Sequence, residues 1–275
     1  MIYMKYCYHT HTKRCGHAVG EDEEYVIEAI KAGIKDLGFS DHVFLKGITQ
    51  QGIRGDYSCL DDYISSINKL KEKYKKDINI YVGFEAEYFP PYIDYYKELI
   101  ESNKIDYLIL GQHFDWTKDN KIGTSFFDCH TRNEINKYLE TVTKAMESGL
   151  FSIFAHPDIC FVGYENEWDE YCEEIAYKIC EVAIKNDVFL EINLCGIWRG
   201  FGFKNHDRYQ YPYYKFWEVV AKTNAKVLIG CDAHDPLHFH DKGYQDALDF
   251  IEKYNIKVID DGSASNVLKK YKKMR

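Results

Sequence analysis

The chain has 275 residues, 45% of them hydrophobic, and a formal net charge of −9 at pH 7. This length suits a single α/β barrel, and the hydrophobic fraction is sufficient for a full-sized core. The acidic balance argues against a nucleic-acid-binding surface, which would be basic, and no apolar run approaches the ~20 residues that span a bilayer. We therefore expect neither a nucleic-acid partner nor a membrane partner.

The cysteines and the N-terminal residues both indicate a cytoplasmic protein. The nine cysteines are odd in number and scattered, and none forms a Cys-x-x-Cys pair. This usage is typical of free thiols in a reducing compartment. Residues 1–5 run directly into the first predicted strand, which leaves no room for a secretory signal peptide.

Short apolar runs alternate with amphipathic stretches of helical period along the whole chain. In chain order, the first part predicts strand 6–9, helix 21–32, strand 37–41, helix 60–74, strand 78–85, helix 93–102 and strand 105–110. A long polar loop at 116–129 precedes helix 133–148, strand 151–155, helix 171–186 and strand 188–193. A loop at 195–211 then leads to helix 213–223, strand 227–231 and helix 244–254. An eighth short strand could follow at 256–259.

Strands that alternate with helices predict a parallel sheet, either a closed barrel or an open doubly wound sheet. Polar residues decide between them, because six of the predicted strands end in His, Glu or Asp side chains. A barrel builds its site as a ring from the C-terminal ends of many strands, whereas an open sheet concentrates its site at one or two loops. The barrel fits better, and without an internal repeat or linker we predict one domain over residues 1–275.

Nine side chains that could bind metal lie at or just after these strand ends: His9, His11, His17, His42, Glu85, His113, His156, Asp232 and His234. A single histidine at a strand end is more often a hydrogen-bonded polar residue than a ligand. Nine such groups on one rim are better explained by metal binding, and neutral imidazoles with carboxylates suit Zn, Mn or Fe. Nine groups exceed the shell of one ion, so we predict two or three divalent metals with Glu85 as the bridging carboxylate.

The same segments resemble the polymerase and histidinol phosphatase (PHP) superfamily, and within it the histidinol-phosphate phosphatases. The matching pieces are HTH at 9–11 with His17, GFSDH at 38–42, GFEAEY at 83–88, GQHF at 111–114, AHPD at 155–158, EIN at 191–193 and CDAH at 231–234. The resemblance implies a distorted, TIM-like (β/α)7 barrel with a trinuclear metal cluster. It implies three ligand sets, which are His9, His11, Glu85 and Asp232; Glu85, His113 and His156; and His17, His42 and His234.

The resemblance also implies a phosphomonoesterase that hydrolyses L-histidinol phosphate to L-histidinol and phosphate in histidine biosynthesis. A water bridging two metals would be the nucleophile because metal binding lowers its pKa, and the metals would offset the charge of the phosphoryl oxygens. We assign catalytic roles to Glu85, Asp232 and His234 and leave the general acid unassigned.

An arginine is expected near the phosphate, because its guanidinium matches phosphate bidentately. Arg199 is the best candidate, since it lies in the glycine-rich loop after the EIN strand. A role as a surface residue is the alternative for Arg199, and Arg14 and Arg208 are weaker candidates for the phosphate.

Other polar residues near the motifs carry smaller expectations. Asp41, Asp158 and Glu87 could each orient a ligand imidazole, with a purely local structural role as the alternative. His238 and His240 repeat the His-x-His spacing after the last motif. We expect both to be exposed to solvent, with substrate contact as the lesser alternative.

Two alternative functions stay open. The same site could hydrolyse another small phosphoester, such as a nucleotide or a sugar phosphate. The barrel could also be a non-catalytic, metal-stabilised partner like those appended to polymerases, although the complete ligand set weighs against this. The sequence leaves the oligomeric state open.

Overall fold

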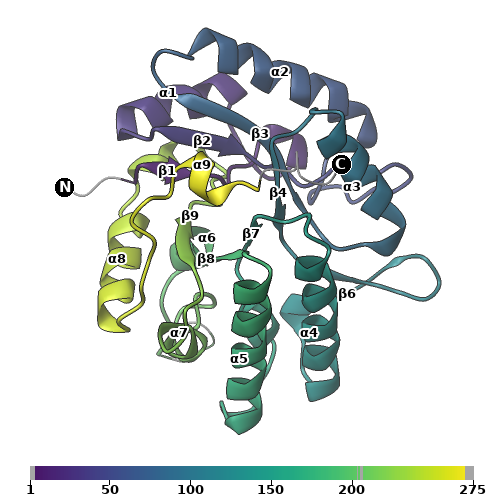
Figure 1. Cartoon of the computed structure of the whole chain (residues 1–275), viewed down its shortest axis with the longest axis vertical. Helices are drawn as coiled ribbons and strands as arrows, with labels where there is room; N and C mark the ends of the chain where they lie inside the picture. The colour runs from purple at the N-terminus through teal and green to yellow at the C-terminus, as the bar shows by residue number, and fades with distance from the viewer. Residues whose placement is uncertain (1–3, 203, 205–206, 270–275) are drawn as a thin grey trace.

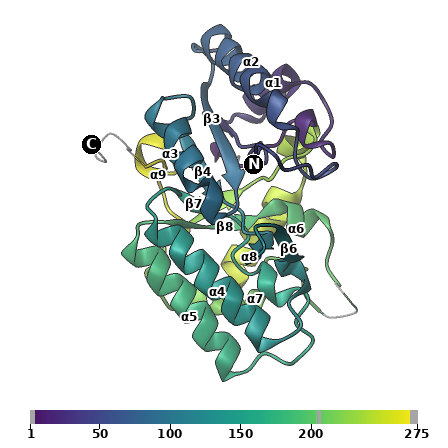
Figure 2. The ribbon, with the colours of Figure 1, turned by 90° about the vertical axis from the view of Figure 1, so that its right-hand side faces the viewer.

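The computed structural model describes residues 4–202, 204 and 207–269. Its strands lie in the middle of the molecule and its longer helices surround them (Figures 1 and 2). Seven strands form one parallel sheet in the order β1-β2-β3-β4-β7-β8-β9. Their bounds are β1 Tyr6–Cys7, β2 Asp36–Phe39, β3 Asn79–Ala86, β4 Tyr107–Leu110, β7 Ile153–Phe154, β8 Phe189–Asn193 and β9 Val227–Gly230.

The first and last strands of this sheet meet just beyond their C-terminal ends. Thr10 and Ala233 form a parallel bridge there. The His11 amide donates to the Ala233 carbonyl at 2.9 Å, and the Ala233 amide donates to the His9 carbonyl at 3.2 Å. The sheet therefore closes into a seven-stranded barrel, and the predicted distorted (β/α)7 fold is confirmed.

Seven helices connect or follow the strands, each within two residues of its predicted bounds. Local signals fix their ends. A capping box between Glu21 and Glu24 begins the first helix, which ends at Gly33 with a left-handed φ of 84°. The seven are α1 Asp22–Ala32, α2 Leu60–Lys73, α3 Ile93–Glu101, α4 Arg132–Glu147, α5 Glu170–Lys185, α7 Tyr214–Ala221 and α8 Gly243–Lys253.

Three predictions about irregular segments need correction. The expected polar loop at 116–129 contains part of an antiparallel hairpin, formed by β5 Phe114–Trp116 and β6 Ile122–Ser125. The expected loop at 195–211 begins inside the short helix α6 Leu194–Trp198, because the Asn193 side chain accepts from the Cys195 and Gly196 amides and caps it. The segment 256–259 forms one bridge to β9, between Val258 and Val227, rather than a strand.

The C-terminal segment closes the end of the barrel opposite the predicted site. The short helix α9 Ala264–Val267 contributes Ala264 and Val267 to a buried cluster with the barrel interior, which includes Tyr8 and Tyr107. The Tyr8 hydroxyl donates to the Gly262 carbonyl at 2.7 Å. One end of the barrel is thus filled by apolar packing, which leaves the C-terminal end of the strands for chemistry.

The helices of the described ranges are all too short or too polar to cross a bilayer. The nine cysteines are free thiols in the structure.

Candidate metal centre

All nine predicted ligand residues gather at the C-terminal end of the barrel, although they come from distant parts of the chain. His9 and His11 follow β1, His42 follows β2, and Glu85 lies near the end of β3. His17 follows the short helix at Lys13–Cys15. The remaining four follow later strands: His113, His156, Asp232 and His234. Parallel strands bring these ends together because their C-terminal ends share one face of the barrel.

Glu85 lies at the centre of this cluster and is 1% exposed. Its Oε1 is 3.1 Å from His156 Nε2 and 3.3 Å from His113 Nε2. Its Oε2 is 3.1 Å from His42 Nδ1. A Cβ added at Gly111 would lie 2.0 Å from Glu85 Oε1, so only glycine at that position leaves room for the carboxylate. This placement suits a carboxylate shared by two ions.

The spacing of His9, His11 and Asp232 fits a metal ion. Their nearest ligand atoms lie 3.2 Å apart for the two Nε2 atoms, 3.1 Å for His11 Nε2 and Asp232 Oδ1, and 3.5 Å for His9 Nε2 and Asp232 Oδ1. Bonds of 2.0–2.1 Å in a tetrahedral zinc site would place neighbouring ligand atoms about 3.3 Å apart. Glu85 completes the set at 3.5 Å from each imidazole.

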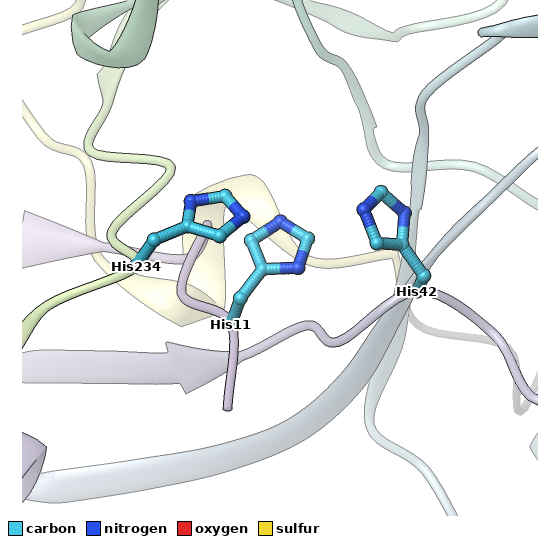
Figure 3. A group of neighbouring side chains, drawn as sticks. All are labelled: His11, His42 and His234. Atoms are coloured by element: carbon cyan, nitrogen blue, oxygen red, sulfur yellow. The ribbon is translucent and has the colours of Figure 1, made fainter. Parts of the chain in front are cut away.

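The third expected ligand set, His17, His42 and His234, is divided between two overlapping groups of side chains. His17 and His234 approach at 2.8 Å between their Nε2 atoms, and Cys15 groups with them. His42 groups instead with His11 and His234, three rings that come from three separate segments (Figure 3). Among the described residues, the structure brings every member of this set into the cluster without placing His17 and His42 around one common point.

Most of the imidazoles also turn Nδ1 towards an acceptor elsewhere in the protein. This second contact fixes which ring nitrogen faces the cluster and how the ring is oriented. The pairs are His9 with Glu191 at 3.0 Å, His113 with Glu87 at 3.3 Å, His17 with the Cys15 carbonyl at 3.4 Å and His234 with the Asp232 carbonyl at 2.9 Å. His11 Nδ1 lies 3.6 Å from Asp41 Oδ1, beyond hydrogen-bond distance. Glu87 therefore lies where the sequence predicted. For Asp41 the contacts support the local structural role, because its Oδ1 accepts from the His42 amide at 3.1 Å.

The hydrogen bond that the structure gives to the Asp158 carboxylate comes from a backbone amide and not from a cluster imidazole. Its Oδ2 accepts from the Tyr213 amide at 2.5 Å. This contact supports a local structural role for Asp158. It does not support the expectation that Asp158 orients a ligand ring.

Sequence reasoning missed two residues that support the cluster. Glu191 is buried against His9, and a Cβ at Gly230 would lie 2.0 Å from its Oε2. Arg54 is buried and donates through Nη2 to both oxygens of Glu87, at 2.8 and 2.9 Å. Glu191 lies in the EIN motif, which offered a signal, whereas Arg54 lies in an irregular segment where no pattern singled it out.

Opposing charges in this buried cluster perturb its pKa values strongly. Burial alone would raise the pKa of the Glu85 carboxyl, but the neighbouring imidazoles, His113 foremost, hold that pKa well below its usual range. Burial disfavours the charged form of His113, yet Glu85 and then Glu87 raise its pKa to about 10. Burial and the charge of His11 lower the pKa of His234 to about 2. Metal binding requires neutral imidazoles, so an ion that enters the cluster must displace the protons that these carboxylates favour.

Two of the cluster residues have strained backbones. His156 and Asp232 adopt φ values of 36° and 52°, in the region that L-residues other than glycine avoid. A left-handed conformation costs about 1–2 kcal/mol for most residues and less for Asp, and residues outside the cluster such as Asn103 and Asn120 adopt it too. The surrounding contacts must therefore hold both side chains in place.

The cluster forms the floor of a cavity of about 410 Å³. Arg199 lines this cavity, lies over the Tyr211 ring at 5.5 Å and donates to Gln210 Oε1 at 3.2 Å. The weaker candidates lie elsewhere. Arg14 pairs with Asp22 and Asp62, both at 2.8 Å, and Arg208 lines a different pocket.

The two histidines of the HFH sequence separate in the structure. His240 is exposed, as predicted, and lies 2.9 Å from Glu28 Oε2. His238 lines the cavity above the cluster, so the expectation that it faces bulk solvent is wrong. A short helix at Pro236–His240 turns the two side chains in different directions.

Comparisons with known proteins identify a family for this chain. The family model of the PHP domain matches residues 8–194. A protein of Deinococcus radiodurans named "Probable histidinol-phosphatase" is 24% identical over 233 residues, which cover 83% of this chain and 85% of that protein. A protein of the same name from Schizosaccharomyces pombe is 24% identical over 274 residues, covering 90% of this chain and 86% of its own.

One solved structure is similar over almost the whole chain. The histidinol phosphate phosphatase of Lactococcus lactis, crystallised with Zn, L-histidinol and phosphate, aligns with a TM-score of 0.66 and 19% identity. The alignment covers 97% of this chain and 99% of the other. At this identity the likeness concerns the fold.

Proposed function

This chain belongs to the PHP domain family, and we propose that it is a metal-dependent phosphomonoesterase that hydrolyses L-histidinol phosphate to L-histidinol and phosphate. The observation that carries the proposal is the convergence of nine imidazole and carboxylate side chains beneath one cavity that Arg199 also lines. The similarity to histidinol-phosphatases supports the choice of substrate. We further propose that it acts as a single domain in the cytoplasm, in histidine biosynthesis.

The proposed cofactors are two or three divalent transition metals, Zn, Mn or Fe. One ion would be held by His9, His11, Glu85 and Asp232, and a second by Glu85, His113 and His156. The third would be held by His17 and His234, with His42 beside them. When bound, such ions lower the pKa of a water molecule towards neutrality and offset the negative charge of a transferring phosphoryl group.

The protein's own residues would bind, orient and shield the reacting groups. Glu191 and Glu87 keep the His9 and His113 rings turned so that Nε2 of each faces the cluster. Arg199 would contact the phosphate oxygens from the cavity wall, as a guanidinium does in bidentate pairs. Phe127 and Tyr211 line the cavity beside the cluster and would exclude water from it.

A panel of phosphate monoesters tests the proposal. Metal-loaded protein is assayed for phosphate release from L-histidinol phosphate, a nucleoside monophosphate and a sugar phosphate. We expect kcat/KM for L-histidinol phosphate to exceed the others by at least tenfold. A preference for the nucleotide or the sugar phosphate would refute the substrate, and no hydrolysis of any ester would refute the activity.

A further inference from the structure

His238 lies at the cavity without belonging to the ligand set. It follows the CDAH motif in the short helix at Pro236–His240, and its ring lines the cavity together with Trp198 and Arg199. His240, two residues later, has left the cavity and pairs with Glu28 on the surface. Of the two histidines in the HFH sequence, only His238 therefore faces the cavity.

Two contacts hold the His238 ring in a fixed orientation. The His234 backbone amide donates to His238 Nδ1 at 3.2 Å. Because Nδ1 accepts this hydrogen bond, the ring is neutral and its proton lies on Nε2. The ring also packs on Trp198, with centroids 3.9 Å apart and planes inclined by 38°.

Trp198 is fixed in turn, because its Nε1 donates to Asp241 Oδ1 at 2.9 Å. Hydrogen bonds within the protein therefore occupy Trp198 Nε1 and His238 Nδ1. Among the described residues, His238 Nε2–H has no hydrogen-bond acceptor. A neutral, oriented N–H donor at a cavity wall is suited to a neutral group with a lone pair. Neutral N–H donors also bind phosphate oxygens, so the affinity for inorganic phosphate has to be measured beside the affinity for the substrate.

We propose that His238 is a specificity-determining residue that donates a hydrogen bond from Nε2 to the organic part of the substrate. The inference rests on the proposed phosphoester hydrolysis, in which the metal ligands and Arg199 serve the phosphate. What remains of the substrate must meet the other walls of the cavity. Those walls include Phe114, Phe127 and Trp198, so they favour a planar ring with a hydrogen-bond acceptor on its edge.

The two histidines of the same motif provide a matched pair of variants. His238→Phe keeps the ring and its packing on Trp198 but removes the N–H donor, and His240→Phe makes the same change outside the cavity. We expect His238→Phe to raise KM for L-histidinol phosphate about five- to tenfold, as for loss of one neutral hydrogen bond, with kcat little changed. In His238→Phe the inhibition constant of inorganic phosphate should stay within about twofold of the wild-type value. In His240→Phe both this constant and KM for L-histidinol phosphate should stay within about twofold of wild type.

A third variant separates a lost contact from a disturbed wall. His238→Gln retains an N–H donor of similar reach and should recover part of the lost affinity. An unchanged KM in His238→Phe would refute the inference. Equal weakening of phosphate and of L-histidinol phosphate would also refute it, because the contact would then not be to the organic part.

Binding of L-histidinol alone tests the same contact without turnover. Calorimetric titration of the metal-loaded wild-type protein with L-histidinol should show binding that His238→Phe weakens about five- to tenfold. If wild-type protein binds L-histidinol in this way but hydrolyses no ester, the proposed function fails and the His238 contact stands. If wild-type protein binds L-histidinol no better than His238→Phe does, or not at all, the His238 contact fails.

Discussion

The buried pair of Arg54 and Glu87 gives a direct test of how the protein supports its cluster. Arg54 Nη2 lies 2.8 Å and 2.9 Å from the two Glu87 oxygens, and both side chains are essentially inaccessible, at 0% and 1% exposure. Glu87 also contacts His113 Nδ1 at 3.3 Å. The pair therefore links an irregular segment of the chain to a ligand imidazole.

Removing either partner alone leaves a buried charge without its nearest opposite charge. We expect Arg54→Met and Glu87→Gln each to lower the free energy of unfolding by about 3–5 kcal/mol. The double variant leaves neither charge, so it should lose less than the sum of the two by about 2–3 kcal/mol. Glu87→Gln should also weaken metal binding about tenfold or more, because it disturbs the orientation of His113.

Urea unfolding of chelator-treated protein measures the four free energies, and a metal titration measures the affinity. The exposed pair Lys144 and Glu140 is a matched control, with side chains 57% and 67% exposed at i,i+4 spacing. The same cycle there should give a coupling of only about 0.3–0.5 kcal/mol. Additive losses at Arg54 and Glu87, within about 0.5 kcal/mol, would contradict the electrostatic reasoning.

Three further predictions concern the cavity and its support. Gly111→Ala should lower metal occupancy and activity at least tenfold, since its Cβ would lie 2.0 Å from Glu85 Oε1; mass spectrometry and phosphate release measure both. Arg199→Ala should lower kcat/KM about 10–100-fold, as for loss of a charged hydrogen bond, with an unchanged circular dichroism spectrum; an unchanged kcat/KM would refute its phosphate role. Asn193→Leu should weaken metal binding, because it removes the amide that donates to Asp232 Oδ2 at 3.2 Å and orients this carboxylate; a calorimetric metal titration that matches wild type would refute this.

Strand ends made much of this architecture readable from the sequence. Most rim residues follow a short apolar run, so their position relative to the barrel could be inferred from local pattern alone, as for His42 after 37–41 and His156 after 151–155. The alternation of strands and helices predicted a parallel sheet, and the polar residues at six strand ends favoured a closed barrel over an open sheet. The structure gathers all nine side chains, as that reasoning required.

The local sequence pattern could not predict which residues from distant parts of the chain contact the cluster. Arg54 meets Glu87 from 33 residues away, and Glu191 meets His9 from 182 residues away. Neither segment carries a periodic signal that names its partner. The position of His238 was misjudged for a related reason, since its exposure depends on Trp198 of a helix that the polar and glycine-rich sequence at 195–211 did not predict.

Metal content measured together with hydrolysis of L-histidinol phosphate tests the central claim most directly. Protein treated with a chelator should be inactive, and titration with Zn²⁺ or Mn²⁺ should restore phosphate release that saturates at two to three equivalents per chain. Full activity in protein shown by mass spectrometry to hold no transition metal would contradict the account. So would a protein that binds two to three equivalents and leaves L-histidinol phosphate intact.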